Sequence, residues 1–253
     1  MSPRITRRHF VATAGSALAS VAFGNCVGSA QSRPGHDGRL TARLRTGVTT
    51  SLKSGPLGLG DGGRDGVIQM PSSLPAGKAP VLFFLHGATQ DHTSVIRRVG
   101  AAADQLGVVL VAPDSRHGTW DAIRNEFDED VVFLNRVLNH VFERVDIDPA
   151  RLAIGGFSDG ASYGLSLGLI NGDLFPRVLA CSPGFIMQAP AHGTPRLFFS
   201  HGTADQVLPI DQCSRVMVPR LRSMGYDVTF KEFEGRHELP PEIAIEALRW
   251  MVG

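Results

Sequence analysis

Short apolar runs alternate with longer segments of helical pattern along most of this chain, from Val67 to the C-terminus. Six runs are nearly continuous in apolar character: Val81 to Leu85, Val108 to Ala112, Arg151 to Gly155, Arg177 to Cys181, Arg196 to Ser200 and Val228 to Phe233. Strands that are apolar on both sides are typical of a parallel sheet covered by helices on both faces. The runs therefore predict the strands of a buried, mostly parallel sheet.

The segments between these runs predict the helices. From Asp121 to Arg144 the apolar residues recur with a period near 3.6, as on a helix with one buried face. Further helices are expected over residues 161–170, 210–225 and 240–251, with Gly225 as a stop signal. Strand, crossover helix and strand, repeated this often, predict a doubly wound α/β fold over residues 67–253.

Residues 31–66 have a different pattern, rich in Gly, Ser and Thr. Weak alternation from Leu40 to Arg45 predicts a first antiparallel strand after a loose arm. The glycines from Gly58 to Gly63 lack the flanking strand and helix of a phosphate-binding loop, so they indicate a turn.

Residues 1–30 have the pattern of an export signal. Arg4, Arg7 and Arg8 precede an apolar stretch of about fifteen residues, short of the roughly 20 that span a bilayer. Small residues follow at a possible cleavage site, and the paired arginines resemble a twin-arginine signal. We expect an exported, periplasmic or secreted protein whose mature chain has no integral membrane segment.

Composition narrows the possible functions further. With 253 residues and 43% hydrophobic content, the chain can bury the core of one large domain. The 25 Lys and Arg nearly balance the 24 Asp and Glu, and no basic stripe follows the leader, which argues against nucleic acid as a partner. Cys26 fits a lipidation signal poorly, and whether Cys181 and Cys213 pair stays open, as does the oligomeric state.

One motif carries candidate chemistry. The sequence Gly156-Phe157-Ser158-Asp159-Gly160 matches G-x-S-x-G and lies between a predicted strand and a predicted helix. The sharp turn that joins such a strand and helix exposes the serine hydroxyl, and the flanking glycines allow the backbone segments to approach. The pattern predicts Ser158 as a nucleophile.

A serine nucleophile needs a base, and a histidine base needs an acid that orients it. In this kind of fold the chain order is serine, acid, histidine, which leaves His192, His201 and His237 as bases. We favour His237, because it follows the last predicted strand. Asp205 follows the preceding strand and is the favoured acid, whereas the helix dipole accounts for its competitor Asp211.

Backbone N–H groups should stabilise the oxyanion that forms when serine attacks a carbonyl carbon. The N–H of Asp159 is one expected donor, and the second comes from the loop after Leu85, either Ala88 or, as the alternative, Thr89. Arg116 and Trp120 lie in a further loop at the same sheet edge and are candidates for substrate binding, as is Thr89. Trp120 could equally pack against the start of a helix.

These motifs resemble the phospholipase/carboxylesterase family of α/β hydrolases, especially exported bacterial esterases related to polyhydroxybutyrate depolymerase and feruloyl esterase. The matching segments are residues 85–90, 112–116, 155–161, 201–209 and 235–238. The resemblance implies an α/β-hydrolase fold, the triad Ser158, Asp205 and His237, and neither metal nor cofactor. Relatives that act on acylated proteins usually have Gln after the serine, where this chain has Asp159.

The sequence therefore predicts a serine carboxylesterase acting on small-molecule or polymeric esters. The alternatives are a thioesterase or peptidase with the same triad, and a non-catalytic protein that binds lipids or polymers. Because no long insertion lies between Gly172 and Pro195, we expect no large cap domain and an open site that favours short acyl groups or polymer ends.

Overall fold

The computed structural model describes residues 37–124 and 126–253. The predicted export signal, residues 1–30, lies outside the described residues. In the described part, no helix is both long and apolar enough to cross a bilayer.

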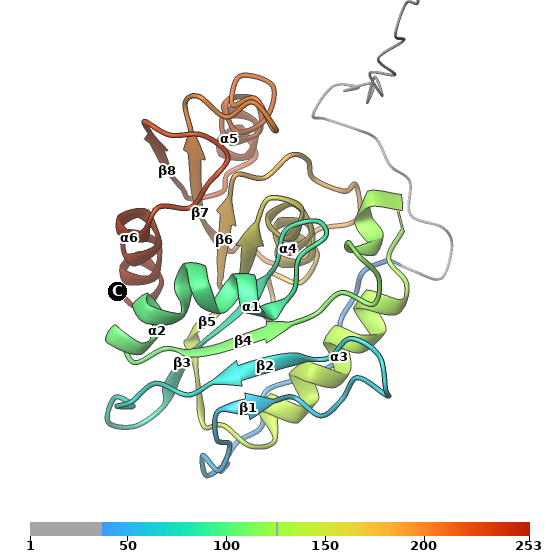
Figure 1. The fold of residues 1–253 in the computed structure, drawn as a ribbon, viewed down its shortest axis with the longest axis vertical. Helices are drawn as coiled ribbons and strands as arrows, with labels where there is room; N and C mark the ends of the chain where they lie inside the picture. Colours follow the sequence, from blue (N-terminus) through green and yellow to red (C-terminus); the bar gives the residue numbers. More distant parts are fainter. Residues whose placement is uncertain (1–36, 125) are drawn as a thin grey trace, which may run out of the picture.

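A single sheet of eight strands runs through the molecule in the order β1-β2-β4-β3-β5-β6-β7-β8 (Figure 1). At one edge, β1 (Gly55–Pro56) pairs antiparallel with β2 (Gly66–Gln69), which pairs antiparallel with β4; all other neighbours pair in parallel. The parallel strands are β3 (Ala79–Leu85), β4 (Val109–Pro113), β5 (Ile147–Phe157), β6 (Arg177–Cys181), β7 (Arg196–Gly202) and β8 (Val228–Phe233). The expected α/β fold with a mostly parallel sheet is confirmed.

Helices cover both faces of this sheet (Figure 1). One face carries α1 (His92–Val95), the π-helical turn η1 (Ile96–Gly100), α2 (Ala101–Gln105) and α6 (Pro241–Val252). The other face carries α3 (Glu129–Phe142), α4 (Asp159–Ile170) and α5 (Ser214–Ser223). The 3-10 turn η2 (Asp121–Arg124) precedes α3 and occupies the start of the single helix expected over residues 121–144.

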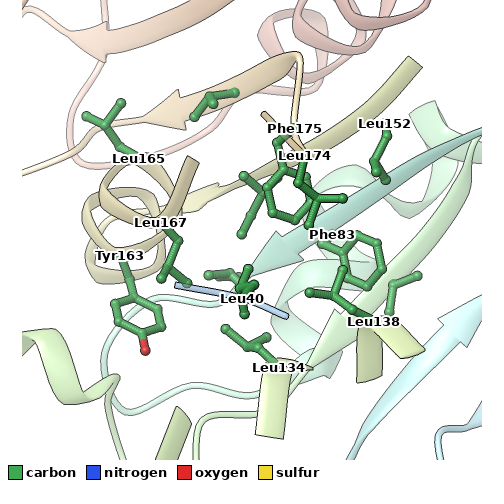
Figure 2. Close-up of a cluster of buried hydrophobic side chains, with 14 of the residues drawn as sticks. Leu40, Phe83, Leu134, Leu138, Leu152, Tyr163, Leu165, Leu167, Leu174 and Phe175 are labelled. Atoms are coloured by element: carbon green, nitrogen blue, oxygen red, sulfur yellow. The ribbon is translucent and has the colours of Figure 1, made fainter. Parts of the chain in front are cut away.

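The alternation of side chains along β3 divides the core into two layers. Val81, Phe83 and Leu85 face one layer, whereas Leu82 and Phe84 face the other. All five are essentially inaccessible to solvent. Figure 2 shows the first layer, which contains Phe83 together with side chains from the arm, from α3 and α4, and from the segment after α4: Leu40, Leu134, Leu138, Leu165, Leu167, Leu174 and Phe175.

The prediction of a strand from Leu40 to Arg45 is wrong. The segment pairs with no strand, and the N–H groups of residues 40–42 bond to side chains instead. Leu40 N–H donates to the Asn171 side chain at 2.9 Å, and Ala42 N–H donates to the Asn135 side chain at 2.8 Å. Leu40 and Ala42 are buried, so the alternation reflects docking of an arm onto α3 and α4.

Candidate active site

The turn between β5 and α4 carries Ser158 in a strained conformation. Its φ of 58° and ψ of −120° are unusual for a residue with a side chain. The backbone around this turn is closely packed. A Cβ on Gly156 would lie 2.7 Å from the carbonyl oxygen of Leu85 at the end of β3. A Cβ on Gly160 would overlap the carbonyl oxygens of both Leu85 and His86. The glycines of the motif therefore let β3, β5 and α4 meet.

Replacing Gly160 with alanine is expected to destabilise the fold by about 3 kcal/mol, because the overlapping atoms belong to the backbone of a central strand and cannot move aside. Urea unfolding measures the change. Gly118→Ala is the matched control, since nothing lies within 4 Å of a Cβ at that position. Equal stability of the two variants would contradict the packing described here.

The structure brings together Ser158, His237 and Asp205, which are distant in sequence. The Nε2 atom of His237 lies 2.8 Å from the Oγ atom of Ser158, and its Nδ1 atom lies 2.6 Å from Oδ2 of Asp205. Because a carboxylate only accepts, Nδ1 carries the proton and donates it to Asp205. Nε2 is then free to accept the Ser158 hydroxyl proton, as a base must.

Buried hydrogen bonds fix the carboxylate of Asp205. Its side chain is completely buried, and its Oδ1 atom accepts from the N–H groups of Val207 at 2.9 Å and Leu208 at 2.8 Å. Its Oδ2 atom faces His237 and also lies 3.3 Å from Nε2 of the buried His201. Asp211, the competing acid, is exposed and pairs with Arg215 at 2.7 Å.

The two other candidate histidines do not contact Ser158. His201 is buried, with Nδ1 2.7 Å from the Ser214 hydroxyl and Nε2 2.7 Å from the carbonyl oxygen of Leu208. Burial lowers the pKa of His201, so it is a neutral brace beneath the loop that carries Asp205. His192 lies on an exposed loop before β7.

The loop of residues 86–90, here called the oxyanion loop, lies beside the serine. A Cβ on Gly87 would be 3.4 Å from that of Ser158. The N–H of Thr89 donates to the carbonyl oxygen of Gly118 at 2.6 Å, so it cannot serve as an oxyanion donor. The N–H of Ala88 makes no hydrogen bond to the rest of the described chain, which favours Ala88 over Thr89.

The second expected donor is the N–H of Asp159, the first residue of α4. The first N–H groups of a helix have no partner within it, and the partial positive charge there favours an anion. The turn thus leaves one amide at the helix start and one in the oxyanion loop available to a negative oxygen.

Trp120 does not line the site. It is fully buried, with its ring stacked on Tyr163 at a centroid distance of 5.3 Å and its Nε1–H donating to the carbonyl oxygen of His86 at 2.8 Å. The expected contact with substrate is therefore wrong, and the packing alternative holds. The sequence around Trp120 has no apolar periodicity, so the sequence alone cannot distinguish substrate contact from packing.

Arg116, a second candidate for substrate binding from this loop, is held by contacts within the fold. Its guanidinium lies over the ring of Phe133, 3.4 Å from the centroid, and donates to the carbonyl oxygen of Asp114 at 2.9 Å. None of its contacts involves a residue of the triad. The exposed side chain of Thr89 stays a candidate for substrate contact.

Two neighbours of the triad were not anticipated from the sequence. The ring of Phe157 lies 4.9 Å from the imidazole of His237, and the guanidinium of Arg98 lies 4.5 Å from the centre of the same Phe157 ring. The motif marks Phe157 only as a variable position, and Arg98 lies in a helix that was not predicted. Together they support one side of the imidazole.

Cys181 and Cys213 are both buried thiols in the structure. Burial raises the pKa of the Cys181 thiol to about 12, so it stays protonated and unreactive.

Comparison with solved structures identifies the same fold elsewhere. The esterase PE8 superposes with a TM-score of 0.61 at 19% identity, over 79% of this chain and 99% of that one. At this identity the likeness establishes the fold alone.

Sequence relatives include two fungal enzymes. Feruloyl esterase C from Emericella nidulans is 27% identical over 158 residues, and acyl-protein thioesterase 1 from Gibberella zeae is 28% identical over 135 residues. The matches cover 59% and 47% of this chain, and this chain spans 57% and 56% of the two relatives. The family model described as Phospholipase/Carboxylesterase matches residues 58–249, so this chain belongs to the phospholipase/carboxylesterase family of α/β hydrolases.

Proposed function

We propose that this protein hydrolyses carboxylic esters through an acyl-serine intermediate. The observation that carries the proposal is the continuous hydrogen-bonded line from Ser158 Oγ through the His237 imidazole to Asp205, with distances of 2.8 and 2.6 Å. Membership of a carboxylesterase family supports the same reaction.

In the first half of the reaction, Ser158 Oγ attacks the ester carbonyl carbon while its proton passes to Nε2 of His237. The buried Asp205 carboxylate stabilises the imidazolium that forms. The carbonyl oxygen becomes an oxyanion, which accepts from the N–H groups of Ala88 and Asp159. Collapse of this intermediate breaks the bond to the alcohol oxygen, which takes the proton from Nε2.

In the second half, water replaces the alcohol. His237 removes a proton from the water as it attacks the acyl carbon, and the oxyanion forms again in the same place. The bond to Ser158 Oγ then breaks, the serine regains its proton from Nε2, and the carboxylic acid leaves.

Thioester hydrolysis is the second candidate. Its support is the likeness to acyl-protein thioesterase 1, and the same triad would attack a thioester carbonyl. Against it, this chain has Asp159 where depalmitoylating relatives usually have Gln. Cleavage of peptides, or binding of lipids or polymers without turnover, remains as a further outcome for the test.

The substrate side of the site supports short acyl groups or polymer ends. The loop between β6 and β7 contains no inserted helix, and Val207 beside Asp205 is 55% exposed. Without a covering segment in residues 37–124 and 126–253, little surface is available there to bury a long acyl chain.

A series of p-nitrophenyl esters tests this proposal, with acetyl, butyryl, octanoyl and palmitoyl groups in detergent-matched assays. We expect kcat/KM to be highest for the two short esters and at least about tenfold lower for palmitoyl. A matched acetyl thioester and an acetylated peptide amide should be poorer substrates than the oxygen ester. Preference for palmitoyl would contradict the open site, and preference for the thioester or amide would replace ester hydrolysis by the second candidate.

A further inference from the structure

We propose that the side chain of Asp159 is a positioning residue for the oxyanion hole, which it holds together by linking the serine turn to the loop opposite. The proposal rests on the proposed function, because it concerns the two N–H groups assigned to the oxyanion. The link runs through residues 114–120, here called the bracing loop.

The bracing loop holds the oxyanion loop at three points. The N–H of Ser115 donates to Nε2 of His86 at 3.0 Å, and Trp120 Nε1–H donates to the carbonyl oxygen of His86 at 2.8 Å. The N–H of Thr89 donates to the carbonyl oxygen of Gly118 at 2.6 Å. Because these bonds flank Ala88 on both sides, the position of its N–H follows the position of the bracing loop.

Asp159 holds the bracing loop to the serine turn. Its Oδ2 atom accepts from the hydroxyl of Thr119 and from the N–H of Trp120, the latter at 3.2 Å. The backbone N–H of the same residue is the other expected oxyanion donor. One residue therefore carries one donor and fixes, through two hydrogen bonds, the loop that orients the other.

Packing alone does not account for an acid at this position. Asp159 is 5% exposed, and its Oδ1 atom is buried with no hydrogen-bond partner among the described residues. Burial also raises the pKa of its carboxyl group to about 6. A buried polar atom without a partner lowers stability, so Oδ1 gives no reason for an acid at this position. The contacts of Oδ2 are the feature that an apolar residue would lose.

The bracing loop is also anchored independently of Asp159, at Arg116 and directly after Trp120. Asp130 at the start of α3 accepts from the N–H of Arg116 at 2.6 Å through Oδ1 and from the N–H of Asp121 at 2.8 Å through Oδ2. Loss of the Asp159 side chain should therefore shift Thr119 and Trp120 without releasing the whole loop. The expected consequence is a loss of activity that exceeds any loss of stability.

The test compares Asp159→Leu, which removes both hydrogen bonds and keeps a side chain branched at Cγ, with Asp159→Asn, which keeps one acceptor oxygen. With p-nitrophenyl acetate we expect Asp159→Leu to lower kcat about 100-fold with KM changed less than about threefold, because only the transition state carries the oxyanion. Asp159→Asn should keep kcat within about tenfold of wild type. The inhibition constant of phenylboronic acid, which forms a tetrahedral adduct on serine, should rise about 100-fold in Asp159→Leu.

Asn171→Ala is the matched control. Asn171 is buried at the opposite end of α4 and bonds to the backbone of Gly38 and Leu40, so its loss should lower Tm but leave kcat unchanged. If Asp159→Leu does not fold, Thr119→Val removes one of the two hydrogen bonds of this link from a partly exposed position and should lower kcat about tenfold.

A kcat within about twofold of wild type in Asp159→Leu, or in Thr119→Val where the first variant does not fold, overturns the positioning role. So does a fall in kcat that Asn171→Ala reproduces at equal Tm. A wild-type protein without ester turnover would instead contradict the proposed function. The phenylboronic acid affinities would then still decide whether Asp159 orders the two amides.

Discussion

Replacing Ser158 with alanine is expected to lower kcat for p-nitrophenyl acetate by at least about 10⁴-fold. Among the described residues, the Oγ atom is the group placed to attack a carbonyl carbon and to pass its proton to His237 Nε2, 2.8 Å away. Its side chain makes no other hydrogen bond within the described part of the chain, so Tm and the far-UV circular dichroism spectrum should match wild type. Steady-state kinetics and thermal unfolding measure the two effects.

Ser166→Ala provides the matched control for this variant. Ser166 lies on the same helix, two turns further on, and accepts from the N–H of Met187 at 2.9 Å. Its loss should reduce stability by about 1 kcal/mol and leave kcat unchanged. If Ser158→Ala retained turnover within about tenfold of wild type, another nucleophile would have to be at work.

Asp205→Asn is expected to lower kcat by about 10⁴-fold while leaving the site nearly isosteric. The carboxylate holds the proton of His237 on Nδ1 through the 2.6 Å contact, whereas an amide nitrogen facing the ring favours the wrong tautomer. The Oδ1 contacts to Val207 and Leu208 can persist in asparagine, so the loop should keep its conformation. KM should change little.

Asp211→Asn separates this effect from a general change of charge. Asp211 is six positions away and pairs with Arg215 at the surface, so its neutralisation should leave kcat within about twofold of wild type. Equal losses in the two variants would indicate a long-range field effect rather than orientation of His237.

The triad could be predicted from the sequence because its signals are local and its order is fixed by topology. The G-x-S-x-G turn has a steric requirement that glycines reveal, and parallel strands bring the loops after β5, β7 and β8 to one edge. These rules select His237 and Asp205 from several candidates, and the structure places the His237 imidazole within hydrogen-bond distance of both Asp205 and Ser158.

Helices and strands with a weak or ambiguous hydrophobic pattern could not be predicted correctly from the sequence. The segment from His92 to Gln105 was not predicted as helical, because it is split into α1, a π-helical turn and α2, which disturbs the 3.6-residue period. The alternation at Leu40 to Arg45 resembles a strand, yet the amides of this arm are satisfied by side chains from α3 and α4. The antiparallel edge is instead made by the short strands β1 and β2.

The side chains that hold the site in place could not be predicted from the sequence, because their roles depend on contacts between loops. Trp120 lies in the loop after β4, at the same edge of the sheet as the site. Only the packing of its ring against Tyr163 establishes that its side chain is buried. The motif assigns a role to the Asp159 amide and none to its carboxyl group. No periodicity in the sequence marks the hydrogen bonds that this carboxyl group accepts from Thr119 and Trp120.

Mass spectrometry of the protein quenched during turnover of p-nitrophenyl acetate tests the central claim most directly. The account predicts one acetyl group per chain, located on the peptide that contains Ser158 and absent in the Ser158→Ala variant. In Asp205→Asn the same group should appear more slowly. An acetyl group on another residue, or ester turnover with Ser158 never acetylated, would contradict it.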